Sequence, residues 1–166
     1  DTRPLSSKQI CDYLVEKLSI PDYHAQLAAG FACGNLGRAL RFASSSEFEE
    51  RKEAILHLFR HLDEMTTSEV LASVKPLIED KSAIADELDL ILLWFRDVLI
   101  LKASQKADEL VYKGEISELR RYAATRSFPA LNRVILAVET ARRRLKANVS
   151  AETVFELLFL TMRDTE

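Results

Sequence analysis

Few residues of this chain have the type and spacing that catalysis or ligand binding requires, and Arg38 is the first of them. It follows Gly34 and Asn35, which suit a left-handed helix end and the cap of a new helix. Arg38 therefore falls in the first turn of a helix predicted over about residues 36–43. A cation there opposes the helix dipole by roughly 0.3–1 kcal/mol. A bound anion or a carboxylate partner would remove this conflict, and a solvated arginine is the structural alternative.

The densest positive charge lies near the end of a helix predicted over about residues 128–147. Arg142, Arg143, Arg144 and Lys146 surround one leucine there. The helix dipole favours cations at this end, which explains most of the cluster. A phosphate or DNA contact through Arg142, Arg143 and Lys146 remains a hypothesis, and no aromatic side chain is interleaved as a stacking platform.

The sequence predicts no catalytic residue, no cofactor and no metal site. It contains neither a phosphate-binding loop nor a serine-hydrolase motif. His57 and His61 lie four residues apart and could share a metal, but no third ligand with suitable spacing accompanies them. Cys11 and Cys33 form no metal or redox motif. Two such cysteines fit a reduced, cytoplasmic setting.

The most apolar stretch is a predicted helix containing residues 87–102. Apolar residues lie on nearly all its sides, which is typical of a buried helix. Its longest unbroken apolar run, Leu90 to Phe95, is far shorter than the roughly 20 residues that a membrane span needs. Either the helix is covered by its own domain on all sides, or a partner subunit covers part of it.

Two stretches are predicted to contact a partner subunit. In the central helix, Arg96 and Asp97 interrupt the apolar surface without an intrahelical ionic partner. If they are buried, each needs a partner from elsewhere, because a lone buried charge is very costly. The alternative is that this side reaches solvent. The final helix, which begins near Ser150, is again apolar nearly all round. The predicted interface residues are Trp94, Phe95, Arg96, Asp97, Phe155, Phe159 and Met162.

Composition predicts an all-α protein of ordinary globular type. The 166 residues carry a net charge of −3, with 48% hydrophobic and 30% charged residues and only 4 Gly and 4 Pro. Helices are predicted over about residues 7–18, 23–32, 36–43, 47–65, 67–79, 82–105, 115–125 and 128–147, and a last helix is predicted to start at Ser150. The run of three serines at 44–46 divides a three-helix module, residues 1–45, from a helical-bundle domain, residues 46–166.

Three segments resemble the C-terminal part of the delta-prime subunits of bacterial DNA polymerase III, in the clamp-loader family. They are AAGFACGNLGRAL at 28–40, WFRDVL at 94–99 and LKANVS at 145–150 before a leucine-rich helix. Their order and spacing span nearly the whole chain. One departure is Ser150, where the family usually has asparagine.

The resemblance implies a small helical AAA+ lid at residues 1–45 and a collar oligomerisation domain at residues 46–166. It implies a non-catalytic assembly role, with gamma/tau and delta subunits as partners, the sliding clamp and primed DNA as indirect partners, and no membrane. Gly34, Gly37 and Arg38 match the position called sensor 2, which reaches nucleotide phosphates in ATP-binding relatives and here would be a relic or a structural contact.

Three alternatives remain open from the sequence. The chain could be the equivalent region of a delta or gamma/tau subunit. It could be a generic helical protein-interaction adaptor of unrelated origin. A nucleotide hydrolase using Arg38 is the third, and the missing phosphate-binding loop argues against it.

Overall fold

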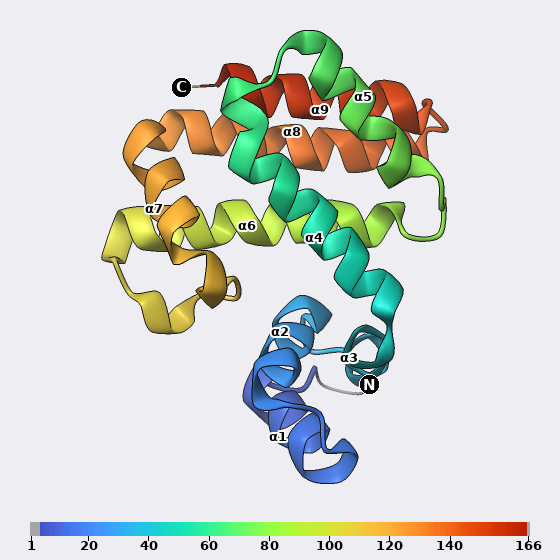
Figure 1. The fold of residues 1–166 in the computed structure, drawn as a ribbon, viewed down its shortest axis with the longest axis vertical. Coiled ribbons are helices and arrows are strands. Elements are labelled where there is room, and N and C mark those ends of the chain that lie inside the picture. Colours follow the sequence, from blue (N-terminus) through green and yellow to red (C-terminus); the bar gives the residue numbers. More distant parts are fainter. Residues whose placement is uncertain (1–3, 166) are drawn as a thin grey trace. The chain divides into compact units, whose positions relative to one another are not determined.

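The computed structural model describes residues 4–165, and helices make up most of this range (Figure 1). The chain forms two compact units, residues 1–50 and 51–166. The described residues contain no strand, which confirms the all-α prediction. No helix among them is long and apolar enough to cross a membrane.

The first unit contains three short helices, α1 (Ser7–Leu18), α2 (Asp22–Ala32) and α3 (Leu36–Ser44). Helix α2 packs against both of the others. Its buried side is built largely of alanines, which allow the helices to approach closely. The core of this unit consists of Ile10, Leu14, Ala25, Leu27, Ala28, Ala29, Phe31, Ala32, Ala39, Phe42 and Phe48.

The boundary between the units lies inside helix α4 (Ser46–His61), slightly after the serine run. Phe48, in the first turn of α4, stacks on Phe42 with ring centroids 4.2 Å apart. It also meets the edge of Phe31 at 5.5 Å. Because these contacts bury the Phe48 ring among aromatic side chains of the first unit, the start of α4 belongs to that unit even though it follows the serine run.

Gly34 joins α2 to α3 in a conformation that favours glycine. Its φ is +86°, and Cys33 before it is also left-handed. A Cβ on Gly34 would lie 2.8 Å from Cβ of Pro4 and 3.1 Å from the carbonyl oxygen of Leu5. The Leu5 amide donates to the Gly34 carbonyl at 3.1 Å. The predicted positive φ is confirmed, and it lets the start of the chain lie directly against this turn.

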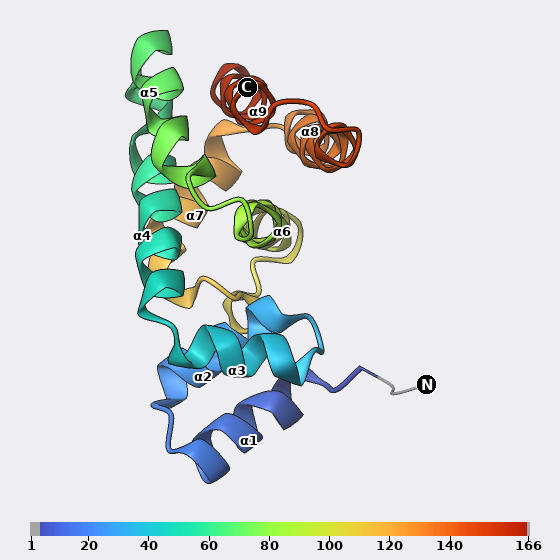
Figure 2. The ribbon, with the colours of Figure 1, turned by 90° about the vertical axis from the view of Figure 1, so that its right-hand side faces the viewer.

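The second unit is built around helix α6 (Ile84–Ser104). The rest of α4, then α5 (Thr67–Ile78), α7 (Ile116–Thr125), α8 (Phe128–Lys146) and α9 (Ala151–Asp164) complete the unit, with short 3-10 turns at 62–64, 107–109 and 113–115. Figure 2 shows α6, α8 and α9 nearly end-on, with α4 upright to their left. Helix α6 packs on α7 and α8, and α9 packs on α5 and α8.

An aromatic cluster fills the space between α4, α6 and α7. Trp94 stacks on Phe59 with centroids 4.7 Å apart and meets the edges of Tyr112 and Tyr122. The Tyr122 hydroxyl donates to the Phe59 carbonyl at 2.8 Å, and the Tyr112 hydroxyl donates to the Leu90 carbonyl at 2.8 Å. The domain itself therefore buries this side of α6, whereas Leu92, Leu93, Leu99 and Ile100 remain half-buried.

A buried ionic network closes the other end of this cluster. Arg126 is 4% exposed, lies over the Tyr122 ring at 4.0 Å and donates to Asp63 at 2.5 Å and to the Met162 carbonyl at 3.4 Å. Arg121 donates to Asp63 at 2.7 Å. Burial opposes ionisation of Asp63, but the hydrogen bonds and charges of Arg126 and Arg121 outweigh it and lower the pKa of this carboxyl. The network ties α7 to the end of α4 and to α9.

Glu87 is a buried carboxyl on the first turn of α6. It is 1% exposed, and its Oε2 accepts no hydrogen bond from the described residues. Burial raises the pKa of Glu87 from 4.5 to about 8, although the nearby Arg51 lowers it. A carboxyl in such a place is protonated at neutral pH, because an unpaired buried charge is costly.

Gly34→Ala is expected to destabilise the first unit by about 1–3 kcal/mol, because alanine resists a positive φ and its Cβ would strike Pro4. Gly37→Ala lies within helix α3 and is the control; its Cβ would lie 3.3 Å from Oδ1 of Asn35, so it is expected to change stability by less than about 1 kcal/mol. Urea unfolding followed by circular dichroism measures both. Equal stability of the two variants would contradict this account of the turn.

Glu87→Gln is expected to remove a pH dependence of stability. The unfolded carboxyl ionises near pH 4.5 and the folded one near pH 8, so the wild type loses stability as pH rises between these values. At pH 8 the variant should be more stable by roughly 1–3 kcal/mol. Denaturant unfolding at pH 4.5, 6 and 8 measures the difference. Glu79→Gln, at an exposed site, is the control; parallel profiles of wild type and Glu87→Gln would refute the prediction.

Candidate interaction surface

The structure places three of the four interface residues predicted on α6 inside the domain. Trp94, Phe95 and Asp97 are each 0% exposed. They are covered by the chain's own helices, so their prediction as partner-contacting residues is corrected. Arg96 is different, because 47% of its side chain is exposed. Of the four, it alone can reach a second subunit.

Asp97 has its partners within the same chain. Its Oδ2 accepts hydrogen bonds from the backbone amides of Val111 and Tyr112, each at 2.8 Å. Arg96, the preceding residue, donates to Oδ1 at 3.2 Å. Burial raises the pKa of Asp97, and the two backbone hydrogen bonds oppose that rise. This carboxyl therefore fastens the 107–115 connection to the middle of α6.

The predicted interface residues of α9 are also buried. Phe155, Phe159 and Met162 are each 0% exposed, because that side of α9 packs against α5 and α8. Their prediction as surface residues is corrected in the same way. The opposite side of α9 carries Leu157, which is 46% exposed. The helix thus keeps an apolar surface, on a different face from the predicted one.

Leu157 lies in a groove between α8 and α9. From α8 the groove is lined by Leu136, which is 56% exposed, and by small side chains. Leu136 and Leu157 thus line the same groove, although they come from different helices. Arg133 and Arg144 are the charged residues of the lining, which comprises Arg133, Leu136, Ala137, Thr140, Ala141, Arg144, Val154, Leu157, Leu158 and Thr161. Nothing in the sequence analysis pointed to Leu136.

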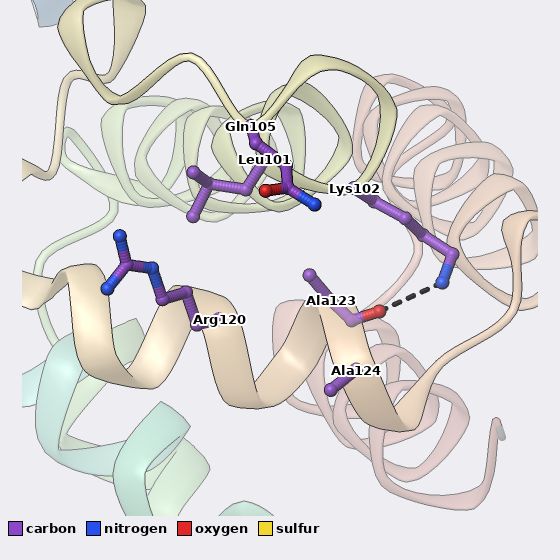
Figure 3. Close-up of a pocket in the computed structure, with 6 residues that line it drawn as sticks. All are labelled: Leu101, Lys102, Gln105, Arg120, Ala123 and Ala124. Carbon is purple, nitrogen blue, oxygen red and sulfur yellow. Dashed lines mark hydrogen bonds between the residues drawn. The ribbon is translucent and has the colours of Figure 1, made fainter.

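A second, more polar hollow lies where the end of α6 meets α7 (Figure 3). The Lys102 ammonium donates to the Ala123 carbonyl at 2.9 Å and lies 5.2 Å from the ring centroid of Phe128. Gln105 and Arg120 also line it. Because the Lys102 ammonium of α6 bonds to a backbone carbonyl of α7, it connects the two helices.

The sensor-2-like residues lie at the turn into α3. The Arg38 amide donates to the Asn35 side chain at 3.0 Å, which confirms the predicted cap. The Arg38 guanidinium lies 5.3 Å from the Phe42 ring centroid, and that of Arg41 lies 5.5 Å from it. Arg38 therefore has a cation–π contact within its own unit. A nucleotide role for Gly34, Gly37 and Arg38 stays a prediction.

The basic run is divided by the structure. Arg142 is ion-paired with Asp89 of α6, so it ties α8 to α6. Arg143 donates to Thr140 at 3.1 Å and is exposed, as is Lys146. A phosphate contact through the exposed members stays a prediction, whereas Arg142 already has a carboxylate partner.

His57 and His61 lie with ring centroids 4.7 Å apart on an exposed side of α4. Among the described residues, no group of three or more His, Cys, Asp or Glu is placed to hold a metal ion. The pair has no third ligand of this kind within the part of the chain that is described.

Comparison with known proteins now bears on these surfaces. The model of the family described as DNA polymerase III, delta subunit, C terminal, matches residues 45–162. The chain belongs to this family. The match covers the second unit almost completely, including α6, α8 and α9. No solved structure matches the chain.

A curated relative extends the likeness to the first unit. DNA polymerase III subunit delta′ of Bacillus subtilis (strain 168) is 26% identical over 165 residues, which are 98% of this chain. The chain spans 49% of the length of that relative. Together these matches confirm the resemblance to the C-terminal region of the delta-prime clamp-loader subunits.

Asp97→Ala is expected to destabilise the second unit by about 3 kcal/mol, because it leaves two backbone amides buried without an acceptor. Asp97→Asn keeps one acceptor oxygen and should cost roughly 1 kcal/mol. Urea unfolding followed by Trp94 fluorescence measures both.

Asp108→Ala, at an exposed position of the same connection, is the matched control and should change stability by less than about 0.5 kcal/mol. If Asp97→Ala behaved like this control, the carboxyl would not be what fastens the connection to α6.

Proposed function

We propose that this chain is a non-catalytic assembly region of a DNA polymerase III clamp loader. Residues 1–45 would be an AAA+ lid and residues 46–166 a collar, which joins gamma/tau and delta subunits in the cytoplasm. Through that assembly, the chain would help to load the sliding clamp on primed DNA. The observation that carries the proposal is the family match over residues 45–162.

Two further features support an assembly role. The delta-prime relative aligns with 98% of the chain, so it extends over the first unit, most of which the family match at residues 45–162 does not reach. The surface of the second unit also retains exposed apolar side chains on α8 and α9 after its own core is complete. A surface of this kind suits the association of unlike subunits.

The main competing function is that of a generic helical adaptor. The exposed leucines fit this role equally well, and the two functions differ in the partners that they require. An adaptor of unrelated origin would show no preference for clamp-loader subunits. The other alternative is that the chain is the equivalent region of a delta or gamma/tau subunit. The similarity to a delta-prime subunit favours the delta-prime assignment over this one.

The chain is expected to form a mixed complex with the gamma/tau and delta subunits of the same organism. Size-exclusion chromatography with light scattering measures the mass of the chain alone and of the mixture. Arg96→Ala is expected to weaken assembly without unfolding, because nearly half of this side chain is exposed and its partner Asp97 keeps two backbone hydrogen bonds.

Four outcomes are informative in this experiment. A mixed complex supports the clamp-loader role, and its absence with both subunits contradicts it. If the chain bound only one of the two subunits, it would be placed next to that subunit in the assembly. Assembly of Arg96→Ala at wild-type affinity would remove Arg96 from the interface and leave the wider proposal standing.

A further inference from the structure

The groove between α8 and α9 offers an apolar surface that the chain does not fill. Leu136 and Leu157 come from different helices, are 56% and 46% exposed, and line the same hollow. Single exposed leucines are normal on a protein surface, but a pair that faces one groove is typical of a binding site. Below them the core is complete, since Val138, Val154 and Leu158 are buried. The groove thus reflects surface shape and not a packing defect.

The charges at the groove are of one sign. Arg133 and Arg144 line it, and no carboxylate does. Neither arginine forms an ion pair with another residue in the range 4–165. They lie eleven positions apart on α8, which corresponds to about 16 Å along the helix axis. An occupant therefore meets an apolar floor with a cation toward each end.

We propose that this groove binds one amphipathic helix of another clamp-loader subunit, with an apolar ridge of about three turns and an acidic side chain near each end. The inference rests on the proposed function and names the surface through which it would act. The acidic residues would pair with Arg133 and Arg144, while leucine-sized side chains pack between Leu136 and Leu157.

A second copy of this chain fits the groove poorly. In a two-fold symmetric pair the same groove would face itself, which brings Arg133 of one copy toward Arg144 of the other. Like charges facing each other across an interface cost several kcal/mol and exclude such partners. A nucleic-acid strand fits poorly as well, because the lining offers no aromatic side chain on which bases stack.

The test measures affinity for the purified gamma/tau and delta subunits of the same organism by biolayer interferometry. Leu136→Glu and Leu157→Glu are each expected to weaken binding by roughly tenfold or more. The double variant Arg133→Glu/Arg144→Glu should weaken it similarly and also lose the wild type's sensitivity to salt.

Matched controls come from other surfaces. Leu18→Glu changes a leucine of the first unit that is 46% exposed, the same fraction as Leu157. Arg120→Glu reverses an exposed cation at the α6–α7 hollow. Both are expected to bind within about twofold of wild type. Because all the substituted side chains are exposed, circular dichroism should show every variant folded, and the arginine pair tests the groove without touching its apolar floor.

The outcomes separate the two proposals. If the wild type binds and the groove variants bind equally well, the groove is not the interface and the assembly role stands. If the wild type binds neither subunit, both are overturned. Groove variants that abolish a dimer of the chain alone would identify a second copy as the occupant. Loss of single-stranded DNA binding in the arginine pair but not in Leu136→Glu would identify nucleic acid. Either result overturns the helix proposal.

Discussion

The burial of α6 is the constraint on which the second unit depends. A helix that is apolar on nearly all sides can be stable in water only if other elements cover it. The aromatic rings of Phe59, Tyr112 and Tyr122 do so around Trp94. The hydroxyls of the two tyrosines donate to backbone carbonyls, whereas Nε1 of Trp94 is buried without a hydrogen-bond partner among the described residues.

Polar groups set the positions of the elements around that core. Asp97 holds the connection after α6, and Arg126 with Asp63 holds α7 against the end of α4 and against α9. Such groups are expensive to bury, and each is matched by charge or hydrogen bonds. Glu87 is the exception, and it is accommodated by protonation instead of by pairing. The fold therefore combines an apolar interior with a few directional ties.

This arrangement decides which surfaces remain for association. The buried residues of α6 and the inner side of α9 are used for the chain's own core, where they contribute stability. What remains for association is Arg96 of α6 and the outer side of α8 and α9, with Leu136, Leu157 and two arginines that form no ion pair among the described residues. An assembly subunit needs both parts, a core that is independent of its partners and a surface that is not.

The sequence by itself determined the all-α class, the helices to within a few residues, and the turn at Gly34, because these follow from local periodicity and capping. It also indicated that α6 and α9 were more apolar than one covered face requires.

Only the tertiary structure decided what covers them, because side-chain spacing along one helix does not say which neighbours pack on it. For the same reason the partners of Asp97, fourteen and fifteen residues away, and those of Arg126 could not be predicted. The α8–α9 groove exists only where two helices meet, so neither helix alone predicts it.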